Sequence, residues 1–473
     1  MQYPTLLEYM KAIQDAVNNL DKLAHLSVVL DGQGEPCHIS GDSSVVFKMQ
    51  DKTTGKCYAL KCFTKAQKGC ADASSNSSSM KYVEKELLVL SQSKEEKYPV
   101  ELMDWVDGDS LGASQLKVED MSTEATKAEL NEAITDEFGV KYSKDGRKLL
   151  KVPQKLKGTY AIKEGTKIIC DRAFEDCKSL RSLVIPNSVT SIGESAFSFC
   201  SSLKSIVLPD GITSIGDETF FGCSSLASLV IPDSVTSIDT LAFCFCSSLK
   251  SLVIPDGVTS IGDGAFCTCE SLESLVIPGG VTSIEKMAFS GCKSLKSIVI
   301  PDGVTSIGSG AFNGCESLKS IVIPDSVTCI GNRAFEYCFS LKSLVFSKSL
   351  TSIGDWAFNM AESLESLVIP DSVTSIGDYA FSGCRSLKSL VISNSVTDIA
   401  VGAFLSCTSL SSVVIPDGVT SIGEGAFIGC ESLKSIVIPD GVVSIEKDAF
   451  RDCNFPNDFK QKLISRFGDK IFG

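Results

Sequence analysis

The chain has 473 residues, a net charge of −14, 43% hydrophobic residues, 20 cysteines and only 2 histidines. This length allows two or three domains and a large buried core. Two histidines, His25 and His38, are too few for a multi-histidine metal site or a histidine-rich catalytic centre. The acidic charge argues against a nucleic-acid partner, because phosphate backbones are bound by basic surfaces.

Residues 1–10 lack the basic segment and the apolar run of a secretory signal. No stretch of the sequence approaches the roughly 18 to 20 consecutive apolar residues that a membrane-spanning helix needs. We therefore expect a cytoplasmic protein without a membrane span, and the cell surface is the alternative location.

Residues 1–115 are predicted to form a small α+β domain. Two strands are expected on either side of a turn at Thr54–Gly55, and the second strand carries Lys61 in an Ala-x-Lys sequence. This segment resembles the N-lobe of a protein kinase. Val46 matches the valine that lies under the nucleotide, Lys61 matches the lysine that pairs with its phosphates, and residues 103–106 match the hinge.

The parts that a kinase uses for catalysis are missing from this resemblance. Only Gly41 remains of the glycine-rich phosphate loop, and a polar tract at 71–79 replaces the helix that carries the glutamate partner of the lysine. No catalytic-loop or metal-binding motif follows. The resemblance implies a truncated, inactive lobe in which Lys61, Val46 and Gly41 are the candidate remnant of a nucleotide site.

Residues 116–136 are polar and are predicted to form a linker. Residues 137–162 are predicted to cap the repeats that follow, with two strands around a turn at Asp145–Gly146. Such a cap is needed because the open end of a repeat array exposes its core to water.

From residue 174 onward a phenylalanine recurs every 23 residues, thirteen times without an insertion, from Phe174 to Phe450. A cysteine follows three residues later in twelve of the thirteen copies, and Ala361 replaces it in the other. Within one unit, residues 205–208 read as a short strand, residues 209–211 as a turn, and the rest as turn-like or helical pieces. A period in the low twenties predicts a solenoid whose units pack only against their neighbours.

The pattern L-x-x-L-x-I-P-x-x-V-x-x-I-G-x-x-A-F-x-x-C resembles the BspA-like, or TpLRR-type, leucine-rich repeat over about 300 residues from Tyr160 to Cys453. The resemblance implies an α/β repeat fold: a right-handed solenoid of about 13 coils over residues 163–455, with a parallel sheet on one face. It also implies a protein-binding role without catalysis. Such repeats occur in bacterial surface adhesins, in some microbial eukaryotes and in intracellular multidomain proteins.

Residues 456–473 are predicted to seal the last coil with a helix. Asn457 or Asp458 is the expected N-cap, and Phe459, Leu463, Ile464 and Phe467 share one face.

Strand alternation predicts an outward row of serines and an outward row of valines, flanked by a mostly lysine column. The candidate binding residues on this face are Val184, Val207, Val230, Val253, Lys204 and Lys250. A second candidate surface contains Trp356 and Tyr379, which precede the Ala-Phe pair in their repeats, because such aromatic residues concentrate in binding hot spots. The alternatives are that valine and serine merely suit a flat strand surface and that the aromatic residues pack locally.

The recurring cysteines are interpreted as one buried column of free thiols rather than a disulfide framework, which favours a reducing compartment. Cys244 and Cys267 lie outside this column, one coil apart, and are candidates for pairing or for metal binding. The sequence therefore predicts a non-enzymatic scaffold that binds a protein partner and uses no cofactor or metal. A BspA-type surface adhesin and a remnant kinase with residual nucleotide binding are the two alternatives.

Overall fold

The computed structural model describes residues 26–28, 38–40, 44–51, 57–63, 80–91, 94–104 and 122–473. The chain divides into two compact units, Met1–Glu119 and Asp120–Gly473. Gly41 and the second half of the expected hinge, residues 105–106, lie outside the described residues.

In the first unit, six strands form one antiparallel sheet in the order β1-β3-β4-β6-β5, with β2 paired to β3. The strands are β1 (Leu26–Val28), β2 (His38–Ser40), β3 (Ser44–Asp51), β4 (Cys57–Phe63), β5 (Met80–Ser91) and β6 (Lys94–Asp104). β3 and β4 are the two strands expected around residues 54–55, and their register places Val46 opposite Lys61. The kinase-like identity of this unit stays a prediction.

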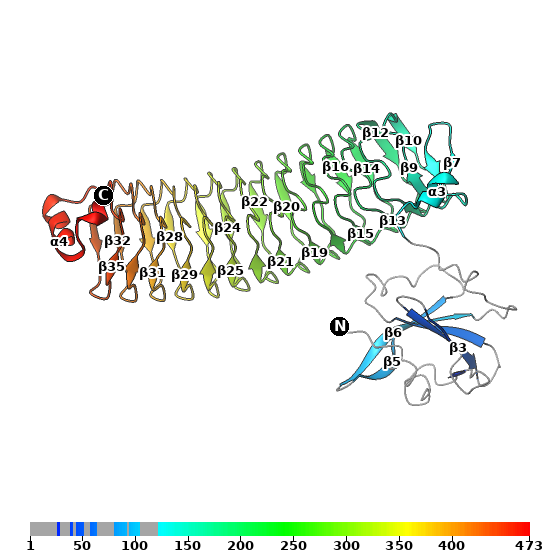
Figure 1. Ribbon diagram of the computed structural model, residues 1–473, viewed down its shortest axis with the longest axis horizontal. Coiled ribbons are helices and arrows are strands. Elements are labelled where there is room, and N and C mark those ends of the chain that lie inside the picture. Colours follow the sequence, from blue (N-terminus) through cyan, green and yellow to red (C-terminus); the bar gives the residue numbers. More distant parts are fainter. Residues whose placement is uncertain are drawn as a thin grey trace. The chain divides into compact units, whose positions relative to one another are not determined.

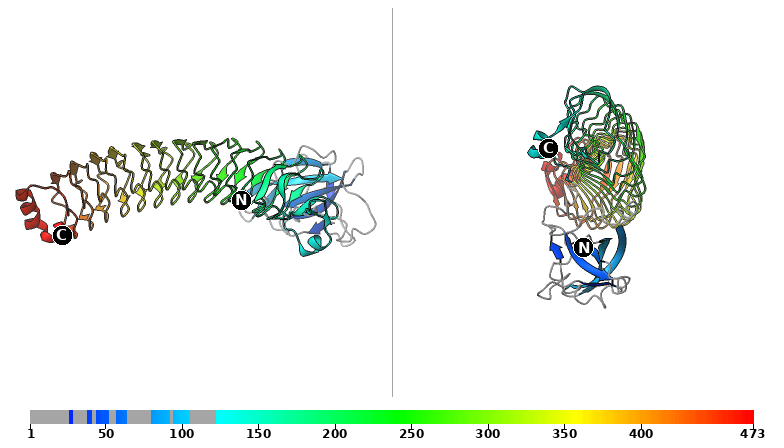
Figure 2. Two further views of the ribbon diagram at one scale, coloured as in Figure 1. Left: turned by 90° about the horizontal axis from the view of Figure 1, so that it is seen from above. Right: turned by 90° about the vertical axis from the view of Figure 1, so that its right-hand side faces the viewer.

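The second unit is a stack of 23-residue coils, each with two short parallel strands (Figure 1). Most first strands pair with the first strand of the next coil, so that Ser205 lies beside Ser228, and most second strands pair in the same way, as Ser214 does with Ser237. Viewed from above, this stack bends smoothly along its length (Figure 2).

The first strands are β12 (Ser179–Val184), β14 (Ser205–Val207), β16 (Ser228–Val230), β18 (Ser251–Leu252), β20 (Ser274–Val276), β22 (Ser297–Val299), β24 (Ser320–Val322), β26 (Ser343–Val345), β28 (Ser366–Val368), β30 (Ser389–Val391), β32 (Ser412–Val414) and β34 (Ser435–Val437). The second strands are β13 (Ser191–Ile192), β15 (Ser214–Ile215), β17 (Ser237–Ile238), β19 (Ser260–Ile261), β21 (Ser283–Ile284), β23 (Ser306–Ile307), β25 (Cys329–Ile330), β27 (Ser352–Ile353), β29 (Ser375–Ile376), β31 (Asp398–Ile399), β33 (Ser421–Ile422) and β35 (Ser444–Ile445).

The core of the solenoid is built from columns of identical residues. The thirteen recurring phenylalanines are completely buried, and neighbouring rings lie 5.0–5.7 Å apart between centroids. Eleven of the recurring cysteines donate from Sγ to the carbonyl oxygen of the phenylalanine 26 residues earlier, at 3.1–3.6 Å. The cysteine column is therefore a buried wall of free thiols, each of which also satisfies a backbone carbonyl of the preceding coil.

Each coil returns to its next first strand through a segment that we call the outer turn, which holds the Ala-Phe pair. In the coil around Phe358, the backbone N–H groups of Trp356, Phe358 and Met360 donate to the next coil at 2.7–2.8 Å. Trp356 and Met360 have positive φ, and the same two positions have positive φ in every coil. All seventeen non-glycine residues with positive φ in the described chain fall on these two columns.

The outer turn explains one difference from the expected α/β repeat. The described coils contain no helix between residues 163 and 455, because two left-handed residues four positions apart interrupt every outer turn before a helix can form. The pieces expected to be turn-like or helical are turns and a second strand. The solenoid is therefore a parallel β-solenoid with two strand ladders, where sequence reasoning predicted one.

The N-terminal end of the solenoid begins earlier than the expected linker boundary. Residues 122–135 form α3 (Lys127–Asn131) and β7 (Ile134–Thr135), and the Asp171 N–H donates to the Thr123 carbonyl at 2.9 Å. This part of the predicted linker is ordered because Thr126 and Glu129 form a capping box and Glu129 forms an ion pair with Lys148 at 3.1 Å.

The strands that follow α3 join the coils. β8 (Lys141–Tyr142) and β9 (Lys148–Lys151) pair antiparallel on either side of the predicted Asp145–Gly146 turn. β10 (Lys157–Ala161) starts the first-strand ladder. β9 starts the second-strand ladder, because β11 (Ile168–Ile169) pairs with it in parallel. A hairpin thus covers the start of the stack.

The C-terminal end is covered by α4 (Asn457–Phe467) and a 3-10 helix (Asp469–Phe472). The N-cap of α4 is Pro456 rather than Asn457 or Asp458, which form its first turn. Leu463 is buried, and Phe459 and Phe467 pack against the core, as their spacing predicted. The 3-10 helix acts as the next coil, because the Phe450 N–H donates to the Ile471 carbonyl at 2.8 Å.

No helix in the described part of the chain is both long and apolar enough to span a membrane.

Candidate binding surfaces of the solenoid

The first-strand ladder presents an unbroken row of exposed valines, which we call the valine row. Its twelve members are 52–82% exposed, because each side chain points away from the core while the residue before it points inward. The valine row consists of Val184, Val207, Val230, Val253, Val276, Val299, Val322, Val345, Val368, Val391, Val414 and Val437. The structure thus brings the four predicted valines into one continuous apolar strip, with exposed serines at the other outward position of the strands.

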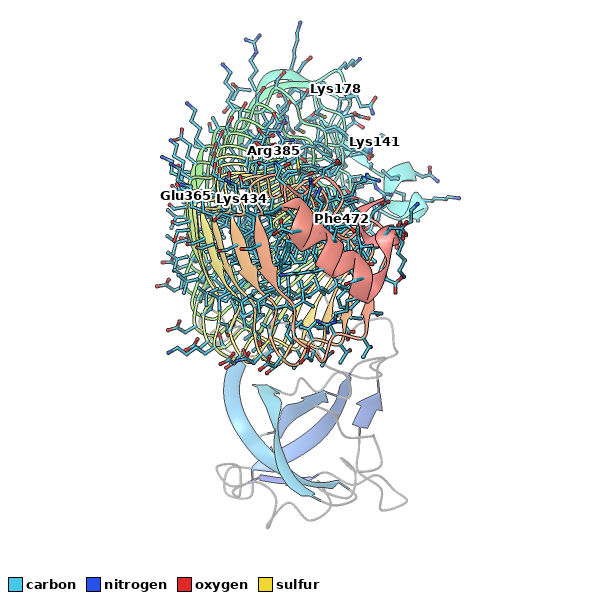
Figure 3. All side chains as sticks on the ribbon, turned by 90° about the vertical axis from the view of Figure 1, so that its left-hand side faces the viewer. Lys141, Lys178, Glu365, Arg385, Lys434 and Phe472 are labelled. Carbon is cyan, nitrogen blue, oxygen red and sulfur yellow. The ribbon has the colours of Figure 1, made fainter. Side chains whose placement is uncertain are left out.

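The column beyond the exposed serines, one residue before each of them, is mixed in charge. Lys204 and Lys250 are exposed, as expected. Where glutamate occurs in this column, the lysine of the next coil pairs with it: Lys296 with Glu273 at 2.6 Å and Lys388 with Glu365 at 3.3 Å. Figure 3 shows Glu365 and Lys434 on the same side of the stack. The column holds Arg181, seven lysines and two glutamates, so it is a basic border in a chain of net charge −14.

Trp356 and Tyr379 lie on the outer turn, away in the coil from the first strand. Their rings stack at 4.3 Å between centroids with an interplanar angle of 19°, and the Arg333 guanidinium lies 5.6 Å from the Trp356 ring. Both aromatic residues are half-buried. The structure brings them together with each other and not with the valine row, so the predicted binding residues form two separate surfaces.

A second aromatic group on the outer turns contains Phe199, which sequence reasoning did not single out. Phe199, Phe221 and Phe245 make edge-to-face contacts at 5.2 and 5.4 Å, and Phe199 and Phe245 are 44% and 48% exposed. The available signal was the recurrence of large apolar residues at positions that are glycine in other repeats, such as Gly222 and Gly291.

Two carboxylates of the outer turns are buried, Glu336 and Asp448. Glu336 is 2% exposed and accepts hydrogen bonds from Asn313 Nδ2 at 2.9 Å and Asn359 Nδ2 at 3.1 Å, one coil away on either side. Arg333 Nη1 donates to Glu336 Oε2 at 3.2 Å and forms an ion pair with it. These partners satisfy the carboxylate, so this cluster joins three coils and is not an open site.

Two stacked parallel ladders, identical core columns and capped ends define a leucine-rich-repeat solenoid of the BspA class. The BspA type leucine rich repeat region family matches residues 167–296, 259–367, 282–410 and 351–473, and the chain belongs to this family.

Several crystal structures of repeat proteins resemble the chain. A leucine-rich repeat protein from Bacteroides ovatus is 29% identical over 72% of this chain and 96% of that one, with a TM-score of 0.49. A leucine rich cell surface protein from Faecalibacterium prausnitzii is 30% identical over 71% and 98%, with a TM-score of 0.44. The leucine-rich repeat protein of T. pallidum is 33% identical over 41% and 82%, with a TM-score of 0.32. No curated protein sequence matches the chain.

Proposed function

We propose that the solenoid is a non-enzymatic protein-binding module and that the valine row is its contact surface. The observation that carries this proposal is the length of the strip: twelve consecutive coils each expose a valine at the same position. Burying such a strip against a partner removes a large apolar area from water. Valine is also stiff about its first side-chain torsion, so little side-chain entropy is lost when the strip is covered.

The border of the valine row indicates the chemistry of the partner. Arg181 and the seven lysines outnumber Glu273 and Glu365 in the column beyond the exposed serines. A partner that covers the valines and also reaches this column gains from acidic side chains along its edge. We therefore infer a protein partner with an apolar strip bordered by acidic residues, whose binding weakens as salt concentration rises.

A triple variant of the full-length chain tests this proposal: Val253→Lys, Val276→Glu and Val299→Lys. The alternating charges imitate the native Lys296–Glu273 pair across coils, so the ladder is preserved while the apolar strip is interrupted. The matched control carries the same three charges at Thr259, Thr282 and Thr305, which are exposed and lie at the position occupied by Val443 in the last repeat. We expect the native chain and the control to capture the same proteins from a cell extract. The valine variant is expected not to capture them. Equal capture by all three contradicts the proposal.

The location of the protein is a separate proposal. The cytoplasmic interpretation is supported by the free thiols of the cysteine column, because cysteines stay reduced in that compartment. The alternative, a surface adhesin, is supported by the similarity to the cell surface protein of Faecalibacterium prausnitzii. Protease treatment of intact cells separates the two: degradation of the solenoid epitope supports the adhesin, and protection until lysis supports the cytoplasmic scaffold.

Residual nucleotide binding by the first unit is the second candidate function. It is supported by the register of β3 and β4, which aligns Val46 with Lys61, and by Glu101 of β6 on the other side of Lys61. A rise in the melting temperature with Mg-ATP that Lys61→Met abolishes supports this function, and an unchanged melting temperature contradicts it.

A further inference from the structure

Cys244 and Cys267 occupy a position that does not require cysteine. Both follow directly after the buried phenylalanine of their coil, in adjacent coils. In the other coils this position holds Glu175, Ser198, Phe221, Ser290, Asn313, Glu336, Asn359, Ser382, Leu405, Ile428 and Arg451. The cysteine column, which we also call the core column, lies three residues after the phenylalanine and is cysteine in twelve coils of thirteen. Packing therefore explains the core column but not this pair.

The backbone holds the two cysteines side by side. The Phe243 N–H donates to the Ala265 carbonyl and the Phe245 N–H to the Cys267 carbonyl, both at 2.8 Å. These two hydrogen bonds bracket Cys244 and place it directly beside Cys267 in the next coil. Coils that pair in this way lie about 4.8 Å apart, which is within the Cα separation of disulfides, roughly 4.4–6.8 Å.

The two thiols differ in their tendency to ionise. The hydrogen bond from Cys244, assisted by the hydroxyl groups of Thr268 and Ser290, lowers the pKa of Cys267, although burial opposes this effect. The same contact, together with burial, raises the pKa of Cys244. Cys267 is therefore the thiol that ionises first and acts as the nucleophile, while Cys244 keeps its proton.

Access also separates this pair from the core column. Cys267 keeps 8% of its surface exposed and Cys244 keeps 2%, whereas Cys246 and Cys269 are completely buried. The core thiols donate to phenylalanine carbonyls, and burial raises their pKa. A small oxidant in water thus reaches Cys267 before any thiol of the core column in these coils.

We propose that Cys244 and Cys267 form a peroxide-reactive dithiol site that closes to a disulfide linking two adjacent coils. The Cys267 thiolate attacks one oxygen of hydrogen peroxide, the O–O bond breaks, and the departing hydroxide is protonated to water. The Cys267 sulfenic acid is then attacked by the Cys244 sulfur, so that the S–S bond forms and the S–O bond breaks. The hydroxide released from the sulfenic acid takes the proton of Cys244 and becomes a second water. In total, two thiols and one hydrogen peroxide give one disulfide and two waters.

A metal site at the same pair is less well supported. In residues 122–473 no three His, Cys, Asp or Glu side chains come together as metal ligands. Two thiols alone provide half of the four ligands of a structural zinc site. Two thiolate sulfurs in neighbouring coils therefore suit covalent pairing better than zinc binding.

The test uses the native full-length chain, treated with hydrogen peroxide and then alkylated and mapped by mass spectrometry. Fragment spectra must distinguish Cys244 from Cys246 and Cys267 from Cys269, because each pair shares a tryptic peptide. We expect a Cys244–Cys267 disulfide, with core-column cysteines left as free thiols. At neutral pH without peroxide, Cys267 is expected to react with iodoacetamide at least about tenfold faster than the core-column cysteines, because its thiolate fraction is larger.

Single variants separate the roles of the two thiols. In Cys244→Ser, the sulfenic acid of Cys267 has no resolving thiol and is trapped as a dimedone adduct. In Cys267→Ser, Cys244 loses its nucleophilic partner and forms neither adduct nor disulfide. Cys292→Ala is the control, since Ala361 is the natural residue in that column, and it is expected to form the same disulfide as the native chain. Peroxide treatment that leaves Cys244 and Cys267 as unreactive as the core column, or that links Cys246 to Cys269 instead, overturns the proposal.

Discussion

Trp356 stacks on Tyr379 at 4.3 Å, and both residues hold a positive φ that glycine adopts in other coils at the same position. The stack stabilises the folded chain, whereas the left-handed backbone of a non-glycine residue destabilises it. A left-handed backbone costs an ordinary residue roughly 1–2 kcal/mol, and a stacked aromatic pair contributes about 0.5–1.5 kcal/mol beyond its buried area.

This opposition predicts an inverted order of stability at Tyr379. Tyr379→Ala removes the stack and keeps the strain, whereas Tyr379→Gly removes both. We expect the glycine variant to be more stable than the alanine variant by about 1 kcal/mol, measured by urea denaturation. At Ser366, an exposed strand residue, glycine is expected to be the less stable of the two. If the alanine variant is more stable than the glycine variant at both positions, the positive φ of Tyr379 is contradicted.

The cysteine column predicts a loss of stability at alkaline pH. Burial raises the pKa of Cys338 and of Cys384 to about 12, whereas unfolded thiols ionise near pH 8.5. Above that pH the unfolded chain loses protons that the folded chain keeps, so stability is complete below about pH 8 and falls as the pH rises toward 12. Each thiol contributes about 1.4 kcal/mol per pH unit within this window.

The measurement compares the native chain with the Cys338→Ala/Cys384→Ala double variant by denaturation between pH 8 and pH 10.5. Lysine and tyrosine ionisation is common to both proteins and cancels in the difference. The variant is expected to be less stable at pH 8, because two buried thiols are removed, and to lose stability less steeply with pH. Parallel curves would show that these thiols do not remain protonated in the folded chain.

Glu336 is predicted to be the most sensitive buried polar residue of the outer turns. Glu336→Ala leaves the Asn313 and Asn359 amides without their shared acceptor. We expect a destabilisation of about 2–3 kcal/mol, because unsatisfied buried donors keep their full desolvation penalty. Trp356 fluorescence reports the local unfolding. The exposed Glu316→Ala is the control and should change stability by less than about 0.5 kcal/mol.

Removal of residues 469–473 is predicted to loosen only the end of the solenoid. The deletion exposes Phe450 and removes the carbonyl of Ile471 that its N–H group donates to. Hydrogen exchange is therefore expected to rise at Phe450 and in the last coils, and to fall off toward unchanged values within a few repeats, since each coil contacts only its neighbours. An equal rise in hydrogen exchange along the whole solenoid would contradict this prediction.

Much of the solenoid was predictable because its core depends on side-chain identity. A 23-residue recurrence of phenylalanine and cysteine specifies which residues are buried, and strand alternation specifies that Val207 points outward while Ile206 points inward. The same logic placed the C-terminal hydrophobic face of Phe459, Leu463 and Phe467 against the last coil.

The backbone of the outer turn was not predictable from one repeat. Nothing in the local sequence at Arg333, Trp356 and Tyr379 indicates a positive φ. The hydrogen bonds between coils impose this backbone conformation against the preference of these residue types. Only the full set of repeats indicates the left-handed backbone. Glycine occurs in four of thirteen copies two residues before the phenylalanine and in five of thirteen copies two residues after it.

The sequence by itself thus determined the period, the core and the outward valines, since these follow from hydrophobic periodicity. Only the tertiary structure decided the second ladder, the 3-10 helix that serves as the last coil, and contacts across coils such as Trp356 on Tyr379. These depend on hydrogen bonds and contacts between residues 23 positions apart, which local preference does not encode.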